Sequence, residues 1–183
     1  CLILGDNIFY GHEFSKLLQS CTTLEEGAII LSHPVKDPKR FGVVEVDKKG
    51  APISIEEKPS QPRSNTAVTG LYFYDNEVLE VLKVLRPSSR GELEITDVNN
   101  NYLSKGLLQV KELGRGFSWF DAGTCQSLLE ASTFVQAIES RQGYMVGCLE
   151  EIAFNNQWIN EEDVLRQARL LQGSEYGSYL NGL

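Results

Sequence analysis

Short apolar runs that end at turn residues alternate along the chain with segments whose apolar positions recur at helical spacing. The short runs predict β-strands, and the helical spacing predicts amphipathic helices packed on one side. Two of the runs flank Lys48-Lys49-Gly50, which predicts a hairpin. Strands are expected at residues 2–4, 28–35, 43–47, 52–57, 67–74, 108–113 and 117–120, and helices at 12–21, 78–85, 95–105, 150–157, 161–172 and from residue 124 onward.

This order of elements predicts an α/β fold with a mixed sheet, because strand, helix and strand come first, hairpins follow, and helices close the chain. The apolar residues 2–4 stop at Gly5, which suits a strand buried on both faces, as in a parallel sheet. The 183 residues are enough to bury a sizeable core. We expect a sheet domain over residues 1–142 and a helical extension over residues 143–183.

Composition and charge narrow the classes of function. The net charge of −8 argues against a nucleic-acid partner, so a bound phosphate would have to meet local cations or a metal ion. The four cysteines, Cys1, Cys21, Cys125 and Cys148, form no CxxC pair, which is typical of a reduced, cytoplasmic chain. No apolar run approaches the roughly 20 residues of a membrane span, so no membrane partner is expected.

Two aspartates follow predicted strands and are the first candidates for chemistry. Asp6 lies where open α/β sheets bind ligands, although it could equally cap a helix that begins near Gly11. Asp121 has no obvious capping role, because Thr124 can cap the next helix by itself. Two such carboxylates could share one Mg²⁺, which takes few protein oxygens and completes its shell with water and phosphate.

Charged residues after the predicted hairpin and before the 95–105 helix are further candidates. Glu57 and Lys58 could form a solvated hairpin edge, or they could accept bonds from hydroxyl groups and pair with a phosphate, respectively. Arg90 could likewise be solvated, or it could bind phosphate through its forked guanidinium. The only histidines, His12 and His33, neighbour no nucleophile, which argues against hydrolysis by a Ser/His or Cys/His pair. The chain contains no glycine-rich phosphate loop of the GxGxxG or GxxxxGK[ST] type.

Taken together, seven segments in this order resemble the sugar-nucleotide pyrophosphorylases, a nucleotidyltransferase family, and most of all its glucose-1-phosphate thymidylyltransferase branch. The segments are LILGDNIFYGHEF, FGVVEVD, ISIEEKP, SNTAVTGLYFYD, RGELEITDVN, GRGFSWFDAGT and IESRQG. The resemblance implies a Rossmann-like, GT-A-like nucleotidyltransferase fold and a homotetramer. It also implies that this chain lacks the family's upstream phosphate loop, so that residues 2–4 would leave an apolar sheet edge that favours self-association.

The resemblance implies a role for individual residues as well. Asp6 and Asp121 would be the Mg²⁺ ligands, and Phe41-Gly42 would be a sugar-contacting turn in which the family often has tyrosine first. Glu57 would bind sugar hydroxyls, Lys58 and Arg90 would bind phosphate, and Val68 would line the sugar pocket. A second, regulatory nucleotide site would involve Gly11, His12, Glu139 and Arg141.

The implied reaction joins dTTP and glucose 1-phosphate to give dTDP-glucose and pyrophosphate, the first step towards dTDP-rhamnose and related deoxysugars. Such a transfer rests on positioning and charge neutralisation and needs no protein nucleophile. Two alternatives remain open: a non-catalytic module that binds sugar phosphate or nucleotide, and a pyrophosphorylase that uses UTP or another nucleotide. If the chain lacks the upstream phosphate loop, we expect it to be inactive by itself. A non-catalytic module would also be inactive.

Overall fold

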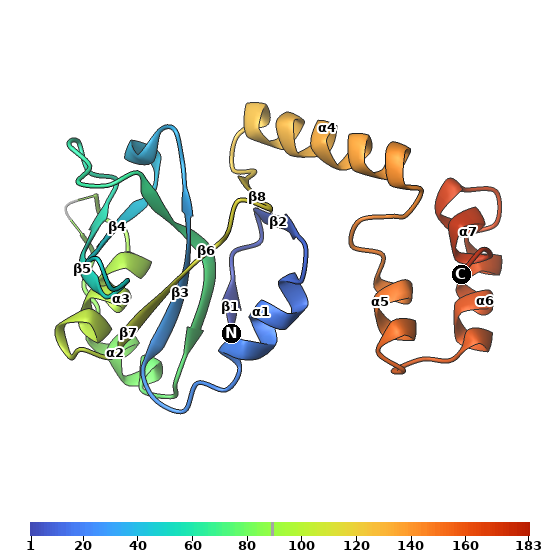
Figure 1. The fold of residues 1–183 in the computed structure, drawn as a ribbon. Helices are drawn as coiled ribbons and strands as arrows, with labels where there is room; N and C mark the ends of the chain where they lie inside the picture. The colour runs from blue at the N-terminus through green and yellow to red at the C-terminus, as the bar shows by residue number, and fades with distance from the viewer. Residues whose placement is uncertain (89) are drawn as a thin grey trace. The chain divides into compact units, whose positions relative to one another are not determined.

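The computed structural model describes residues 1–88 and 90–183, and it divides into two compact units, Cys1–Ser127 and Leu128–Leu183. The division falls inside helix α4 (Cys125–Gln142), ahead of the expected boundary after residue 142. The first unit combines strands with helices, and the described part of the second contains helices only. The predicted α/β class is confirmed (Figure 1).

A mixed sheet forms the centre of the first unit. In the described residues its order is β5-β4-β6-β3-β7, and β1 also pairs with β6. Strands β3 and β7 are parallel, whereas the other pairs are antiparallel, including the predicted β4–β5 hairpin. The strands are β1 (Leu2–Ile3), β3 (Ala28–Pro34), β4 (Gly42–Val46), β5 (Pro52–Glu57), β6 (Thr66–Tyr74) and β7 (Leu108–Glu112).

Alternating side chains of the central strands feed two hydrophobic cores, one on each face of the sheet. In β3, Ile30 joins the core covered by α2 (Val78–Val84) and α3 (Ile95–Ser104), whereas Ile29 and Leu31 join the core covered by α1 (Phe14–Cys21). Figure 1 shows α1 apart from α2 and α3 across the sheet. Because both faces are covered, β6 is buried along nearly its whole length.

Strand β1 differs from its prediction. It was expected to be parallel and buried on both faces, but it pairs antiparallel with β6, with Leu2 opposite Tyr72 and Ile3 opposite Leu71. Leu2, Ile3 and Leu4 are 41%, 55% and 40% exposed. The strand is only two residues long and pairs with one described strand. The exposure of its side chains shows that its faces are not fully covered.

A two-stranded ribbon joins β2 (Asn7–Gly11) to β8 (Phe117–Asp121). Strand β2 was not expected from the sequence. Its register places Asn7 opposite Asp121 and Gly11 opposite Phe117. A side chain at residue 11 would come within 2.2 Å of the Phe117 ring, so the ribbon requires glycine there. The ribbon thereby joins two segments that are far apart in the sequence.

The second unit contains most of α4 and the helices α5 (Leu149–Asn155), α6 (Glu161–Leu170) and α7 (Glu175–Leu180). Its core consists of Cys148, Val164, Ala168 and Leu180. Helix α6 begins with a capping box, in which Asn160 accepts from the Asp163 backbone and Asp163 accepts from the Asn160 backbone. No helix in the described residues is both long and apolar enough to span a bilayer.

Candidate functional site

One cavity of the first unit, of about 160 Å³, collects most of the predicted site residues. It opens where β5, β6, the β2–β8 ribbon and the start of α3 meet. The predicted residues that line it are Asp6, Phe41, Gly42, Glu57, Lys58, Val68 and Asp121. Residues that the sequence did not single out also line it: Leu4, Asn7, Arg40, Gly70, Tyr72, Ile95, Thr96 and Trp119.

The β2–β8 ribbon brings the two aspartates together. Asp6 precedes β2 and its carbonyl accepts the backbone N–H of Ala122 at 2.8 Å, while Asp121 ends β8. A Cβ on Gly123 would lie 3.1 Å from Asp6 Oδ2 and 3.1 Å from Asp121 Oδ1, so both carboxylates converge on the space beside this glycine. Because β2 separates Asp6 from α1, the interpretation of Asp6 as a helix cap is wrong.

The paired carboxylates fit a magnesium ion better than a metal that needs many protein ligands. In residues 1–88 and 90–183, no group of three or more His, Cys, Asp or Glu side chains could hold a metal. Mg²⁺ is usually bound by one or two carboxylates and takes its other ligands from water and substrate phosphates. The convergence of Asp6 and Asp121 on an open space matches that pattern.

Asn7 fixes the Asp6 carboxylate and was missed by the sequence analysis. Its Oδ1 accepts from the Gly70 backbone at 2.9 Å and from the Trp119 indole at 2.7 Å, and its Nδ2 donates to Asp6 Oδ1 at 2.9 Å. A Cβ on Gly70 would lie 2.5 Å from Asn7, so glycine makes room for this side chain. Only the folded chain reveals these contacts, because they join residues from three separate segments.

Glu57 ends β5 and Lys58 follows it, and both side chains line the cavity. Glu57 is 21% exposed and its Oε2 accepts from the Thr96 hydroxyl at 2.5 Å. Lys58 adopts φ 43°, in the left-handed region that costs a non-glycine residue about 1–3 kcal/mol, and its N–H donates to the Phe41 carbonyl at 3.0 Å. The interpretation of Glu57 as part of a solvated hairpin edge is therefore wrong.

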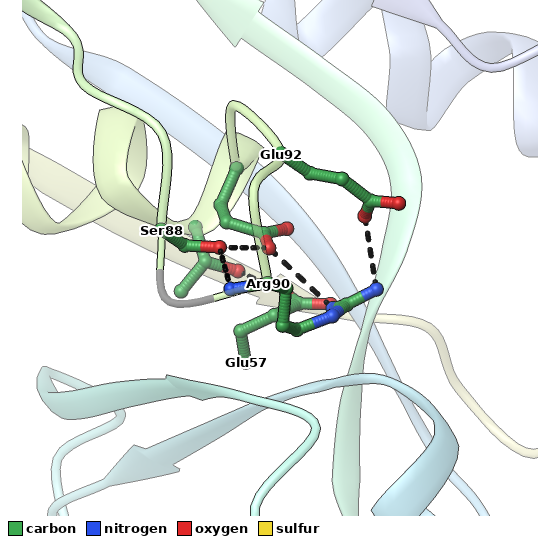
Figure 2. Close-up of polar contacts among 6 residues, drawn as sticks. Glu57, Ser88, Arg90 and Glu92 are labelled. Atoms are coloured by element: carbon green, nitrogen blue, oxygen red, sulfur yellow. Dashed lines mark hydrogen bonds and ion pairs between the residues drawn. The ribbon is translucent and has the colours of Figure 1, made fainter.

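Arg90 lies beside Glu57 rather than among the cavity-lining residues. Its guanidinium Nη1 lies 3.7 Å from Glu57 Oε1 and 3.5 Å from Glu94 Oε1, and its Nη2 lies 3.0 Å from Glu92 Oε2 (Figure 2). Arg90 is thus bound to carboxylates and is not the solvated loop arginine of the alternative prediction.

Aromatic side chains build the remaining wall of the cavity. The rings of Phe41 and Trp119 lie 5.0 Å apart, and the Arg40 guanidinium lies 5.5 Å from the centre of the Phe41 ring. Burial raises the pKa of Tyr72, and the negative charge of Glu57 raises it further, so the Tyr72 hydroxyl keeps its proton at neutral pH. The cavity therefore offers carboxylate acceptors, cations and one protonated phenol.

The predicted regulatory residues fall in different units. Gly11 ends β2 beneath the Phe117 ring, and His12 follows it. Glu139 and Arg141 belong to α4 in the second unit, where Glu139 Oε1 accepts the Val146 backbone N–H at 2.9 Å. Gly11 and Glu139 thus have local structural roles, and the regulatory site stays a prediction.

Comparisons with known proteins identify relatives that match nearly the whole chain. A Neisseria gonorrhoeae protein named glucose-1-phosphate thymidylyltransferase is 53% identical over 180 residues, which are 98% of this chain and 62% of the relative. A relative of the same name from Xanthomonas campestris pv. campestris (strain B100) is 51% identical over 183 residues, which are 100% of this chain and 62% of the relative. The chain therefore spans about three fifths of the length of these relatives.

Solved structures of nucleotidyltransferases superpose on this chain. A Bacillus anthracis crystal structure described as a glucose-1-phosphate thymidylyltransferase superposes with a TM-score of 0.64 and 47% identity, covering 72% of this chain and 52% of that one. A UDP-glucose pyrophosphorylase at 22% identity, with a TM-score of 0.61 over 72% of this chain and 54% of that one, shares the fold. The Nucleotidyl transferase family model matches residues 1–138. The chain belongs to the nucleotidyl transferase family.

Proposed function

We propose that this chain belongs to a glucose-1-phosphate thymidylyltransferase, which makes dTDP-glucose and pyrophosphate from dTTP and glucose 1-phosphate. The observation that carries the proposal is the single cavity that joins the Asp6–Asp121 pair to Glu57 and Lys58. The names of the Neisseria gonorrhoeae and Xanthomonas campestris relatives support the choice of substrates. The product would enter dTDP-sugar synthesis.

The sugar would bind against Glu57 and the Phe41-Gly42 turn. The Glu57 carboxylate can accept bonds from sugar hydroxyls. A side chain on Gly42 would lie 3.2 Å from Thr96 Oγ1 and 3.3 Å from Glu57 Oε2, so glycine keeps that space open. Val68 lines the same space, whereas Phe41 supplies an aromatic ring without a hydroxyl group.

Lys58 would bind the phosphate of glucose 1-phosphate. An oxygen of this phosphate attacks the α-phosphorus of dTTP, a new P–O bond forms, and the bond to the β-phosphate oxygen breaks as pyrophosphate leaves. Both reactants are anions that repel each other, so the ammonium of Lys58 lowers the cost of their approach. The resemblance also implies a phosphate contact for Arg90, whose Nη1 lies 3.7 Å from Glu57 Oε1.

Asp6 and Asp121 would hold Mg²⁺, and Asn7 would keep the Asp6 carboxylate turned towards it. When bound, the ion neutralises charge on the reacting phosphates and on the leaving pyrophosphate. We also propose a cytoplasmic homo-oligomer, a tetramer as the resemblance implies; the four free cysteines are in keeping with a reducing compartment.

The test is pyrophosphate release with glucose 1-phosphate, Mg²⁺ and either dTTP or UTP. We would assay this chain and the chain extended at its N-terminus with the corresponding segment of the Neisseria gonorrhoeae relative. The extended protein should release pyrophosphate faster with dTTP than with UTP. Lys58→Met should abolish most of this release, and Lys49→Met in the hairpin turn should leave it unchanged.

Two results would contradict the proposal. Faster release with UTP would assign another nucleotide, and binding of glucose 1-phosphate without release by either protein would assign a non-catalytic module. Release by the unextended chain would show that the segment in the relative is dispensable.

A further inference from the structure

Glu57 and Lys58 are consecutive residues, yet both side chains line the same cavity. In a regular strand, successive side chains point to opposite faces of the sheet. The alternation along β5 therefore predicts that Lys58 shares a face with Ser54 and Glu56 rather than with Glu57. The end of β5 departs from this alternation, and the departure turns Lys58 towards the cavity.

The departure lies in the backbone of Lys58 itself. Its φ of 43° is in the left-handed region, which residues with a Cβ rarely adopt. Lys58 also precedes a proline, which restricts the residue before it to extended conformations. A strained conformation of this kind persists only where the surrounding structure imposes it. Lys58 therefore takes this conformation because of its neighbours and against its own preference.

The hairpin ladder fixes the chain on the N-terminal side of Lys58. Glu57 lies opposite Gly42 in the β4–β5 register, and the Lys58 N–H extends this pairing by donating to the Phe41 carbonyl at 3.0 Å. The Lys58 nitrogen therefore cannot move without breaking a hydrogen bond to the Phe41-Gly42 turn, which lines the cavity as well.

Pro59 fixes the chain on the C-terminal side. The residue is buried, and its ring restricts its own φ. It lines a small recess together with Ser54 and Glu56, on the face that Lys58 would occupy in a regular strand. Because the chain is anchored on both sides, the left-handed conformation of Lys58 is what joins the two anchors.

We propose that Pro59 is a positioning residue for Lys58: its burial holds Lys58 in the left-handed conformation, so that the ammonium shares one cavity with the carboxylate of Glu57. The strain at Lys58 thereby places two adjacent side chains of opposite charge beside one ligand. This inference deepens the proposed function, because it takes Lys58 to be the cation that meets the phosphate of the substrate.

The first measurement needs no ligand and tests the strain. Glycine adopts the left-handed region freely and alanine does not, so Lys58→Gly should unfold at a higher urea concentration than Lys58→Ala. The matched control is Lys36, an exposed lysine without a positive φ, where glycine should be the less stable substitution. In a Trp158→Phe background, the fluorescence of Trp119, the remaining tryptophan, follows the first unit. Equal midpoints for the two Lys58 variants, or a higher midpoint for alanine, would overturn the strain.

The second measurement asks whether Pro59 imposes the strain. The two Lys58 variants are compared again in chains that carry Pro59→Ala. Without the buried ring the chain beyond β5 can move, so residue 58 can return to a negative φ and the advantage of glycine should disappear. Pro62→Ala in the same loop should leave that advantage in place. If glycine keeps its advantage after Pro59→Ala, Pro59 does not position Lys58.

The third measurement tests the consequence for binding, with inorganic phosphate as the probe in a ³¹P NMR titration. Pro59→Ala should weaken phosphate binding about tenfold, since a contact to a charged group is worth roughly that much, and Pro62→Ala should leave it unchanged. In a Lys58→Met background, Pro59→Ala should have no further effect, because it acts through the ammonium. A purely structural role of Pro59 would weaken phosphate binding equally in both backgrounds and would overturn the proposal.

Failure of this inference and failure of the proposed function give different results. If Lys58→Met weakens phosphate binding and Pro59→Ala does not, the phosphate role of Lys58 stands and the positioning role of Pro59 is wrong. If Lys58→Met binds inorganic phosphate as tightly as the wild-type chain, the proposed function loses this contact and the binding role of the strain fails with it. The urea comparison then still decides whether Pro59 holds the backbone of Lys58.

Discussion

At the scale of single residues, the candidate metal site depends on two carboxylates whose orientation is set by neighbours. Asp6 Oδ1 accepts from Asn7, and Asp121 Oδ1 accepts from the Gly123 backbone at 3.1 Å. Each aspartate therefore has one oxygen engaged by the protein and acceptor capacity left for a cation. Removing either charge should cost metal affinity without removing the local hydrogen bonds.

Asp121→Asn tests this directly. The amide keeps an oxygen for the Gly123 N–H but loses the negative charge, so Mn²⁺, used as a spectroscopic substitute for Mg²⁺, should bind at least about tenfold more weakly, because even outer-shell changes commonly cost that much. Electron paramagnetic resonance titration measures the free Mn²⁺. Asp37→Asn, at an exposed position outside the cavity, is the control, and equal Mn²⁺ affinity in both variants would remove Asp121 from the site.

Arg40 lines the same cavity, and we expect it to contribute to phosphate binding. Its guanidinium lies against the Phe41 ring and lines the cavity without a carboxylate partner in the described residues. Arg40→Ala should weaken binding of glucose 1-phosphate several-fold in a calorimetric titration, because a cation that borders the cavity and could pair with the phosphate is lost. The neighbouring Lys39→Ala serves as the control, since Lys39 does not line the cavity. An unchanged dissociation constant in Arg40→Ala would leave Lys58 as the sole phosphate cation of this cavity in the described residues.

The sequence identified those site residues that stand next to an interruption of the hydrophobic pattern. Asp6 follows an apolar run, Asp121 ends one, and Glu57 and Lys58 precede a proline. Asn7 and Trp119 could not be found in this way, because their hydrogen bond joins positions 112 residues apart. Arg40 stayed hidden for the same reason, since only the folded chain shows that it borders the cavity.

At the scale of elements, Asp75 ties four segments together at the end of β6. Its Oδ2 accepts from the Gly27 backbone at 2.6 Å, and its Oδ1 accepts from the Tyr102 hydroxyl at 2.7 Å and from the Glu77 backbone at 3.0 Å. Burial raises the pKa of Asp75, but these hydrogen bonds and the charge of Lys105 outweigh burial, so the net pKa lies below its usual value.

This shift makes a prediction about acid stability. Because the pKa of Asp75 is lower in the folded than in the unfolded chain, its contribution is present above the unfolded pKa and is lost as the pH falls through the folded pKa. Asp75→Asn should lower the free energy of unfolding of the first unit by about 1–3 kcal/mol at pH 7, because the amide turns an NH₂ towards one of the donors. It should also make the free energy of unfolding fall less steeply as the pH is lowered, which urea unfolding at several pH values measures. Asp97→Asn, at an exposed position of α3, should do neither, and a parallel pH profile in both variants would contradict the assignment.

Elements with a strong hydrophobic periodicity, or with many β-branched and aromatic residues, could be predicted from the sequence. Elements whose conformation depends on tertiary contacts could not. Strands β3 and β6, the β4–β5 hairpin and helices α1 to α6 agree with the hydrophobic pattern. Strand β2 was missed because Asn7–Gly11 gains its conformation from pairing with β8. Helix α7 lies in the expected helical extension but was not placed as a separate element, because it is short and contains Gly177. A Cβ at Gly177 would lie 2.3 Å from the Leu171 carbonyl oxygen, so packing requires glycine in a helix that glycine weakens.

At the scale of the whole molecule, the exposed apolar strand β1 favours self-association, whereas the net negative charge opposes it. Leu2, Ile3 and Leu4 are exposed, and β1 pairs with β6 alone among the described strands. Unpaired strand edges with apolar side chains favour pairing with a second chain. The net charge of −8 opposes this pairing, and salt screens such repulsion.

We therefore expect this chain to associate reversibly, and more strongly as protein and salt concentrations rise. Sedimentation velocity at low and high salt measures the effect. Ile3→Lys should return the chain to the monomer, because a lysine on the edge strand blocks strand pairing while the exposed position leaves the core intact. Val84→Lys on α2 changes an apolar residue that is even more exposed, at 71% against 55% for Ile3, and should not alter association. A wild-type chain that stays monomeric at high salt would show that the short β1 edge is too small to recruit a partner strand, and a matching loss in Val84→Lys would place the contact elsewhere.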